Sequence, residues 1–213
     1  RRAFTESLEF ISDTVKKPTG GKFEFKLYYG EQLSKSKENL DAIAVGAVDA
    51  ALVCQSYHPK KLRTANVLDM PFLPITNFDV QYAVSNAIFS HPAVKKNFKQ
   101  WNATIFAINV LPQYEYMGKG KVPGSVADFK GMRLRALGGM GRSAKKIGAV
   151  PTTVPASETY NALARGTVDA IGFPFTYAFS AYKLDEVAEW YTTNMSLGTV
   201  NCPIVANIDS WNA

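Results

Sequence analysis

Apolar and polar positions in the first half of the chain alternate between helical and strand spacing. An amphipathic helix is predicted near the start by apolar residues three or four positions apart, namely Phe4, Leu8, Ile11 and Val15. The segment 18–21, Pro-Thr-Gly-Gly, is expected to end that helix. Alternation over 23–28 then predicts a half-buried strand. A second predicted helix, 36–46, precedes an almost continuous apolar run over 48–54, which is typical of a strand buried in a parallel sheet.

The second half continues the alternation of helices and strands. Four helices are predicted, with Ser157 as the N-cap of the last: 77–90, 92–101, 142–147 and 157–166. Four strands are predicted in the same part of the chain: 104–111, 132–137, 150–154 and 168–173. Because strands that alternate with helices form βαβ units, the fold class is predicted to be α/β.

A short pattern occurs once in each half of the chain. A helix, a glycine and the residues Val-Asp-Ala lead into an apolar strand at 44–52 and again at 164–172. Two alternatives stay open: coincidence of a common helix-to-strand turn, in which glycine often follows the helix, or two lobes of similar design. Since ligands of open α/β sheets bind beyond the carboxyl ends of strands, the second alternative makes 54–57 and 173–177 candidates for a cleft.

Composition narrows the class of protein. The 213 residues are 46% hydrophobic and 20% charged, an ordinary globular balance, and suffice for two small lobes or one large α/β domain. No apolar run approaches the roughly 18 residues of a membrane-spanning helix. The net charge of +6 is spread along the chain without a Lys/Arg block, so we expect a mildly basic solvated surface and no nucleic-acid partner.

The two cysteines and the start of the chain leave the compartment open. Cys54 and Cys202 could pair, but sequence does not fix connectivity, and each is expected to be a small buried hydrophobic residue. The chain begins Arg-Arg-Ala-Phe, without Met, a signal-peptide apolar stretch or a cleavage site. This opening fits a mature, cropped or proteolysed segment.

Signatures of catalysis and of metal binding are scarce. His58 and His91 lack metal-ligand spacing and each precedes a proline, so solvated or capping roles are expected. The chain has no G-x-S-x-G, P-loop or H-E-x-x-H motif. Gly138-Gly139-Met140-Gly141 follows a predicted strand and could hold an anion at the next helix N-terminus, but it lacks the full dinucleotide fingerprint. No cofactor is predicted, while acid–base pairs assembled by the fold stay open.

Arg135 lies near the end of a strand that otherwise has a buried pattern. One alternative places it with Arg133 on a polar outer face, and the other makes it a fixed two-pronged donor for a carboxylate. The residues 114–116, Tyr-Glu-Tyr, also follow a predicted strand, where aromatic side chains belong to the core, the rim or a pocket wall.

The order of several motifs resembles the DctP-type solute-binding proteins of TRAP transporters. In the second half the resemblance is carried by Asp128-Phe129-Lys130-Gly131-Met132-Arg133-Leu134-Arg135, 147–151, 157–163, 166–169 and 183–187. In the first half it is carried by 20–28, 32–33, 46–53 and 71–73. Nearly the whole chain is covered in one order.

This resemblance implies a two-lobed periplasmic-binding-protein (clamshell) fold, each lobe a mixed sheet flanked by helices. Lobe one would comprise 1–112 and about 199–213, and lobe two 113–198, with the family's N-terminal strand and C-terminal helices lying outside the sequence. It further implies a periplasmic, monomeric protein, with its signal peptide removed and no cofactor or metal. Such a protein closes over a small organic acid and delivers it to TRAP membrane permease subunits. Arg135 would be the family's signature arginine and bind the ligand carboxylate.

Two departures from the family pattern bear on the ligand. Glu115 stands where members commonly carry a second arginine, and Phe173 where an asparagine often binds ligand. An acid beside one arginine suits a zwitterion or another carboxylate with a donor group, and the aromatic residues suit an aromatic or apolar body. Alternatively, Glu115 points away into a salt bridge and the aromatic residues only pack. The predicted ligand-binding residues are Arg135, Glu115, Tyr114, Phe173, Tyr177, Cys54 and Gln55.

Two other functions stay open at this level. A clamshell sensor would signal the ligand to a membrane partner, and an enzyme on the same scaffold would use Glu115 or Asp169 as its base. The missing histidine and nucleophile motifs disfavour the enzyme.

Overall fold

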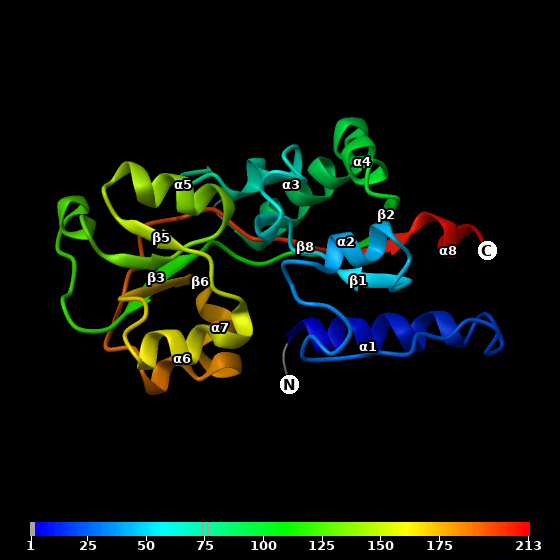
Figure 1. Cartoon of the computed structure of the whole chain (residues 1–213), viewed down its shortest axis with the longest axis horizontal. Helices are drawn as coiled ribbons and strands as arrows, with labels where there is room; N and C mark the ends of the chain where they lie inside the picture. The colour runs from blue at the N-terminus through cyan, green and yellow to red at the C-terminus, as the bar shows by residue number, and fades with distance from the viewer. Residues whose placement is uncertain (1–2, 74, 76) are drawn as a thin grey trace.

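The chain folds into two lobes that lie side by side along its longest axis (Figure 1). The computed structural model describes residues 3–73, 75 and 77–213, without the side chains of Ala3, Thr176, Tyr177 and Phe179. Each lobe has a sheet of its own, flanked by helices. The predicted two-lobed α/β architecture is confirmed.

The first lobe is built on a three-stranded sheet in the order β1-β8-β2. Its strands are β1 (Ala50–Leu52), β2 (Ala103–Asn109) and β8 (Cys202–Asn207). Its helical segments are α1 (Ala3–Lys16), α2 (Asn39–Ala44), η1 (Gln55–Tyr57), η2 (Ala65–Asp69), α3 (Phe78–Ser90), α4 (Pro92–Lys99) and α8 (Ile208–Asn212). Both outer strands pair antiparallel with β8, so the predicted parallel setting of 48–54 is wrong. The reason is that the central strand is supplied by the chain on its return from the second lobe.

The second lobe has a five-stranded sheet in the order β5-β4-β6-β3-β7. Its strands are β3 (Glu115–Gly118), β4 (Arg133–Arg135), β5 (Val150–Thr152), β6 (Ala170–Phe173) and β7 (Trp190–Tyr191). Its helical segments are η3 (Val126–Phe129), α5 (Gly138–Lys146), η4 (Ala156–Glu158), α6 (Thr159–Ala164), α7 (Phe175–Tyr182) and η5 (Leu184–Glu186). β4 pairs in parallel with β5 and β6, and β3 runs antiparallel to β6 and β7. The sheet is therefore mixed, with βαβ units at its parallel part.

The start of the α6 region differs from its prediction. The turn η4 begins at Ala156 and runs into α6, so Ser157 lies inside the turn and makes no capping bond there. Pro155, whose φ of −56° is already near the helical value, precedes the turn and favours this earlier start.

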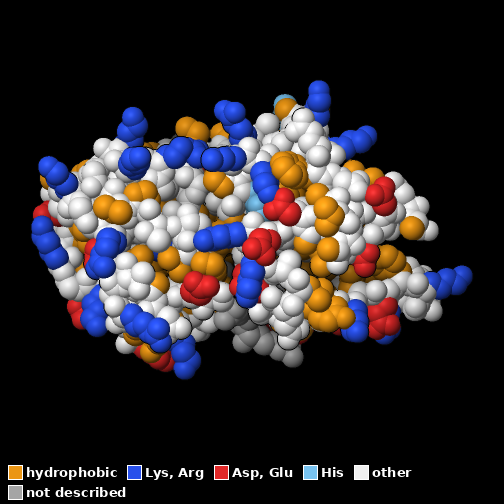
Figure 2. Space-filling model, viewed as in Figure 1, with side chains coloured by type: hydrophobic (Ala, Val, Ile, Leu, Met, Phe, Trp, Pro, Cys, Tyr) orange, Lys and Arg blue, Asp and Glu red, His pale blue; other side chains and the backbone are white. Residues whose placement is uncertain are grey.

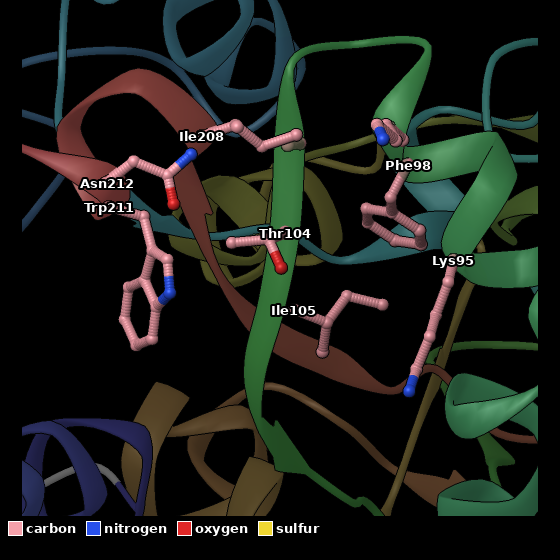
Figure 3. Close-up of a pocket in the computed structure, with 9 residues that line it drawn as sticks. Lys95, Phe98, Thr104, Ile105, Ile208, Trp211 and Asn212 are labelled. Carbon is pink, nitrogen blue, oxygen red and sulfur yellow. The ribbon is translucent and has the colours of Figure 1, made fainter.

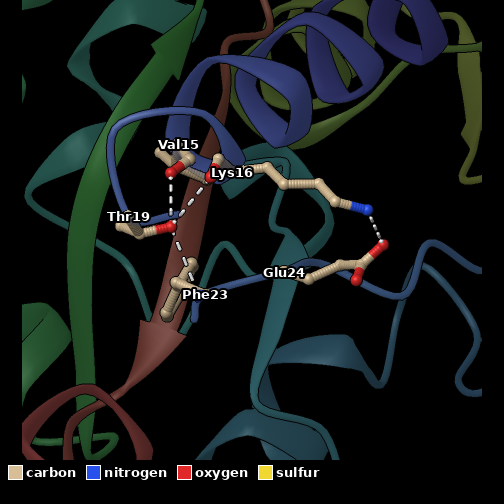
Figure 4. A network of polar contacts seen from close by, with 5 residues as sticks. All are labelled: Val15, Lys16, Thr19, Phe23 and Glu24. Atoms are coloured by element: carbon tan, nitrogen blue, oxygen red, sulfur yellow. Dashed lines mark hydrogen bonds and ion pairs between the residues drawn. The ribbon is translucent and has the colours of Figure 1, made fainter. Parts of the chain in front are cut away.

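The end of α1 is closed by Thr19 (Figure 4). Its Oγ1 lies 2.9 Å from the carbonyl oxygen of Val15 and 3.1 Å from that of Lys16, and it accepts from the N–H of Phe23 at 3.3 Å. Lys16 reaches across the same turn to Glu24, with 2.7 Å between Nζ and Oε1. The predicted end of the helix at 18–21 is confirmed.

The segment 23–28 forms no strand within the described structure, so that prediction is wrong. Its aromatic side chains instead lie against those of the first-lobe sheet. Phe25 stacks on Phe106 of β2, with ring centroids 6.0 Å apart, and Phe106 stacks on Trp211 at 5.4 Å. Alternation decides which side chains share a face, whereas a strand also needs a neighbouring backbone to pair with.

Two stretches of chain, 110–114 and 192–201, cross between the lobes. They are bonded to each other: the N–H of Tyr114 donates to the carbonyl of Gly198 at 3.0 Å, and Thr199 Oγ1 donates to that of Leu111 at 2.5 Å. The lobe limits expected near 112/113 and 198/199 fall inside these stretches and stay a prediction. Away from the crossing, Lys37 of the first lobe donates to the carbonyl of Thr153 in the second at 3.0 Å.

Cys54 and Cys202 form a disulfide, so the expectation of two separate buried residues is wrong. The register of β1 on β8 explains the pairing. Leu52 lies opposite Ile204, and the N–H of Val53 donates to the carbonyl of Pro203 at 2.9 Å. The two cysteines are 148 positions apart in sequence, and only this strand pairing brings them together.

Candidate functional site

Arg135 is the last residue of β4 and is 1% exposed. Its Nε donates to the carbonyl of Val154 at 3.0 Å, and its Nη1 donates to that of Gly172 at 2.8 Å. Because these carbonyls follow β5 and lie in β6, the sheet itself fixes the plane of the guanidinium. A surface position is therefore wrong for Arg135. It holds for Arg133 on the same strand, whose exposed side chain pairs with Asp169 at 2.5 Å.

Tyr57 brings the first lobe to this arginine. It ends the turn η1 that follows β1, and its hydroxyl oxygen accepts from Nη2 of Arg135 at 3.1 Å and from the N–H of Ala156 at 3.0 Å. One oxygen of the first lobe is thus held by two donors of the second. Burial raises the pKa of the Tyr57 hydroxyl above its ordinary value, which keeps it neutral. Tyr57 lies in the predicted cleft segment 54–57, but it was not among the predicted ligand-binding residues.

The positive charge of Arg135 has no carboxylate partner among the described residues. Its described acceptors are two carbonyls and a phenol, and the described ion pairs all involve other residues. A buried ion is costly unless it is paired with an opposite charge. Of the five N–H donors of a guanidinium, the described bonds use three. The interface between the lobes therefore holds a fixed cation, and the described bonds leave two of its N–H donors unused.

Aromatic rings form one wall beside the guanidinium. The central carbon of the Arg135 guanidinium lies 4.6 Å from the ring centroid of Phe173, a favourable cation–π arrangement. Phe173 in turn stacks on Tyr114 at 5.9 Å and packs on Tyr182 at 5.1 Å. The structure therefore brings the predicted residues Phe173 and Tyr114 to Arg135. The side chain of Tyr177 lies outside the described residues.

Glu115 is buried on β3, and the loop after β7 engages its carboxylate. Oε2 accepts from Thr192 Oγ1 at 2.5 Å and from the N–H of Met195 at 3.0 Å, while Oε1 accepts from the N–H of Ser196 at 2.9 Å. No described contact joins Glu115 to Arg135. The carboxylate orders this loop through neutral donors, and its contact with a ligand stays a prediction.

Gln55 lies in the same turn as Tyr57 and is fully buried. Its Nε2 donates to Oδ1 of Asp69 at 3.0 Å, whereas its Oε1 has no hydrogen-bond partner among the described residues. Because buried amide oxygens are nearly always paired, this acceptor calls for an explanation. Cys54, just before Gln55, has its sulfur in the disulfide, which leaves it only apolar contact to offer.

The anion cradle predicted at Gly138–Gly141 is occupied by a carboxylate of the chain itself. Oδ2 of Asp69 accepts from the N–H of Gly139 at 3.3 Å, at the start of α5. A Cβ on Gly138 would lie 2.1 Å from the same oxygen, so a free anion has no room here. Asp69 was missed by the sequence analysis, because nothing in the sequence places η2 against α5.

The two histidines have different roles. His91 caps α4 as predicted, its Nδ1 accepting from the N–H of Ala93 at 3.2 Å. His58 is buried, with Nε2 2.9 Å from Oδ1 of Asn39, so a solvated role is wrong. Since the Asn39 amide donates to the carbonyl of Leu52, its oxygen must accept, and Nε2 of His58 carries the proton. Burial lowers the pKa of His58 to about 4.

A groove lies on the first lobe, and Arg135 is not among the residues that line it (Figure 3). It has a volume of about 330 Å³ and is lined by residues of α4, β2 and α8, among them Phe98, Ile105 and Trp211.

Within the described part of the chain, no group of three or more His, Cys, Asp or Glu residues could hold a metal ion. No described helix combines the length and hydrophobicity needed to cross a membrane.

Charged side chains on the face shown in Figure 2 do not gather in one stripe. Lys and Arg lie along the upper edge, at the left end and near the middle, with Asp and Glu between them. This visible face fits the mildly basic solvated surface expected from the composition.

The sequence model of one protein family, DctP, matches residues 3–213, and the family is described as bacterial extracellular solute-binding protein, family 7. The chain belongs to this family. The resemblance inferred from the order of its motifs is thereby confirmed.

Relatives of this DctP-family protein are similar along most of its length. A solute-binding protein of Verminephrobacter eiseniae is 26% identical over 189 residues, 87% of this chain and 55% of the relative. A monocarboxylate 2-oxoacid-binding periplasmic protein of Nostoc sp. is 25% identical over 212 residues, 96% of this chain and 56% of the relative. The chain thus spans about half the length of these curated relatives.

A solved structure shares the fold of this DctP-family protein. DctP7 of Bordetella pertussis, an extracytoplasmic solute receptor that binds pyroglutamic acid, superposes with a TM-score of 0.87 at 21% identity. The similarity covers 99% of this chain and 68% of that one. At this identity the likeness concerns the fold, and the ligand is that of the Bordetella protein.

Proposed function

We propose that this DctP-family protein binds a small organic monocarboxylate between its lobes and delivers it to the membrane permease of a TRAP transporter. The observation that carries the proposal is the buried guanidinium of Arg135, which faces both lobes and has no carboxylate partner among the described residues. The carboxylate of a ligand supplies the missing countercharge. Guanidinium and carboxylate also match in shape, through two parallel N–H···O bonds that fix orientation as well as charge.

The hydroxyl of Tyr57 occupies the place proposed for a ligand oxygen. It lies between Nη2 of Arg135 and the N–H of Ala156, at 3.1 Å and 3.0 Å, a pair of donors that suits a carboxylate oxygen. A ligand that enters while the lobes are open would take these donors, and Tyr57 would donate its own proton to the ligand. Bonds to an ionised oxygen are stronger than bonds to a phenol, so closure around a carboxylate is favoured over closure without one.

The buried oxygen of Gln55 favours a ligand with a hydrogen-bond donor beside its carboxylate. This oxygen has no partner among the described residues and belongs to the same turn as Tyr57. Pyroglutamic acid, the ligand of the Bordetella relative, has both groups: a carboxylate and a ring N–H. The aromatic wall of Phe173 and Tyr114 suits a flat or apolar body. Glu115 is not needed for this recognition.

The disulfide supports a place outside the cytoplasm. Disulfides such as Cys54–Cys202 persist in oxidising compartments, the bacterial periplasm among them. We propose a periplasmic location on this ground. The proposal further includes a monomeric receptor that binds and releases its ligand unchanged.

Thermal unfolding in the presence of organic acids tests the proposal. The panel contains pyroglutamate, pyruvate as a 2-oxoacid, and aromatic monocarboxylates, each matched with its uncharged amide. A ligand at about 100 times its Kd stabilises a protein by about 2.7 kcal/mol, so at least one acid is expected to raise Tm by several degrees while its amide does not. Failure of every acid, or equal shifts by the amides, would refute carboxylate binding. Conversion of a bound acid during incubation, followed by NMR, would favour the enzyme instead.

A further inference from the structure

Asp69 is a fully buried carboxylate, 0% exposed, that the proposed binding role does not use. It ends η2 of the first lobe. Oδ1 accepts from Gln55 Nε2 at 3.0 Å and from Ser56 Oγ at 2.6 Å, and Oδ2 accepts from the N–H of Gly139 at 3.3 Å. One carboxylate thus ties η1 and η2 of the first lobe to the start of α5 in the second.

Glycines from two other segments make room for Asp69. A Cβ on Gly138, whose φ is +46°, would lie 2.1 Å from Oδ2, and one on Gly139 would lie 2.7 Å from the Asp69 carbonyl oxygen. In the crossing stretch 192–201, a Cβ on Gly198 would lie 2.8 Å from the Asp69 carbonyl carbon. Such distances are too short for any side chain, so α5 and the crossing chain both depend on glycine to reach this residue.

The contacts of Asp69 and of Arg135 form a closed ring. Arg135 ends β4, and Gly139 follows it closely in the chain as part of α5. On the facing side, Ser56 and Tyr57 are neighbours in η1. Asp69 joins Ser56 to Gly139, and the Tyr57 hydroxyl joins the same turn to Arg135. The place where Arg135 meets Tyr57 is therefore set from both sides by one carboxylate.

We propose that Asp69 is a positioning residue for the carboxylate site, holding the N-terminus of α5 against η1 and so fixing Arg135 relative to Tyr57. The inference rests on the proposed function of Arg135. The N-terminus of α5 offers a carboxylate favourable partners, because it carries partial positive charge and unpaired N–H groups. The anion-binding feature of the glycine-rich turn thus serves the architecture of the site.

The energetics of burial agree with this role. Burial raises the pKa of the Asp69 carboxyl to about 7, against the opposing effect of its bonds to Ser56, Gly139 and Gln55 and of the nearby charge of Arg142. A carboxylate kept in such a place at a cost in free energy is expected to have a specific structural task.

The test observes Arg135 directly, without any ligand. In protein labelled with ¹⁵N-arginine, the Nε–H of Arg135 is buried and bonded to Val154, so it should give a slowly exchanging NMR signal, assigned by its loss in Arg135→Lys. The spectra are recorded at about pH 8, above the pKa of Asp69, where Asp69→Asn keeps the size and removes the charge. This variant is expected to shift this signal and to speed its exchange at least about tenfold, as loss of a charged hydrogen-bond partner predicts. Ser56→Ala removes one bond to Asp69 and should act in the same direction, more weakly.

Asp169→Asn is the matched control, because Asp169 binds the other arginine of the same strand, Arg133. It should move the Arg133 signal and leave that of Arg135 in place. An unchanged Arg135 signal in folded Asp69→Asn would overturn the inference. If Asp69→Asn does not fold, an unchanged Arg135 signal in Ser56→Ala overturns it, and a shifted one upholds it.

The affinity for pyroglutamate separates this inference from the proposed function. Asp69→Asn is expected to weaken binding about tenfold, and Asp169→Asn less than about twofold. If the wild type binds neither pyroglutamate nor any other acid of the panel while Asp69→Asn still shifts the Arg135 signal, the function fails and the positioning of Arg135 stands. If the wild type binds an acid and Asp69→Asn binds it equally, with an unchanged signal, the positioning fails and the function stands.

Discussion

Arg135, Asp69 and His58 are ionisable residues in the interior, and the surroundings of each satisfy it differently. Arg135 keeps its charge among neutral oxygens, and Asp69 accepts hydrogen bonds at a helix start. His58 is neutral, with Nε2 bonded to Asn39. Arg135 keeps its charge at every ordinary pH and has no carboxylate beside it among the described residues, which is why we propose the ligand there.

The other two residues predict a pH dependence of stability with opposite signs. His58 has a pKa of about 4 in the folded chain against an ordinary value of 6.5, so the unfolded chain binds this proton more readily. The contribution of His58 to the free energy of unfolding therefore rises as the pH goes from 4 to 6.5. Asp69 has a pKa of about 7 in the folded chain against an ordinary value of 3.8, so the folded chain binds this proton more readily. The contribution of Asp69 to the free energy of unfolding therefore falls as the pH goes from 4 to 7.

Single variants separate the contributions of His58 and Asp69 to the pH dependence of stability. In wild type they largely cancel over this range. In His58→Gln the free energy of unfolding is expected to fall with rising pH, and in Asp69→Asn to rise, each by at most about 1.4 kcal/mol per pH unit. Urea unfolding at several pH values measures this. Parallel pH profiles in all three proteins would contradict these assignments.

Single residues of the site were predictable only in part. The position of Arg135 at a strand end was clear from alternation, but the pattern alone allowed a surface location, and only the motif order favoured a binding role. Tyr57 and Asp69 could not be chosen, because their partners Ala156 and Gly139 lie in the other lobe. For Glu115 the sequence suggested a ligand contact, which stays a prediction, and could not show that its described bonds go to the loop after β7.

At the scale of elements, the segments with strong helical spacing or clear end signals were predicted well. Residues 3–16 and 78–90 are helices as expected, and Asn77 caps the latter by accepting from the N–H of Val80 at 2.9 Å. Elements whose identity depends on a distant partner were not. The segment 23–28 has no neighbouring strand among the described residues. The strand β1 is antiparallel because its partner is β8, which lies near the end of the chain.

The disulfide Cys54–Cys202 links the start of β8 to the chain just after β1. Cys54→Ala with Cys202→Ala, or reduction of the wild type, is expected to lower the free energy of unfolding by about 2–5 kcal/mol, since the bond closes a very long loop. Urea unfolding with and without reductant measures the loss, and the double variant should not respond to reductant. An unchanged wild-type midpoint after reduction would show that the pairing carries no stability.

At the scale of the whole molecule, the lobes are closed on each other around Arg135. Two crossing stretches bonded side by side connect them, and contacts such as Lys37 with Thr153 hold them together away from the crossing. The proposed binding of a ligand at Arg135 would require these contacts to open, and hinge movement of this kind needs only a few crossing residues to change conformation.

The affinity of an Arg135→Lys variant tests whether the guanidinium of Arg135 binds the carboxylate of the ligand. Lysine keeps the charge but loses the two-pronged donor, so the Kd of pyroglutamate, or of the panel acid that stabilises most, should rise about 10- to 100-fold in titration calorimetry. The matched control is Arg133→Lys, two positions away on the same strand and exposed, which should bind like the wild type. An Arg135→Lys variant that binds as tightly as the wild type would show that Arg135 does not bind the carboxylate of the ligand.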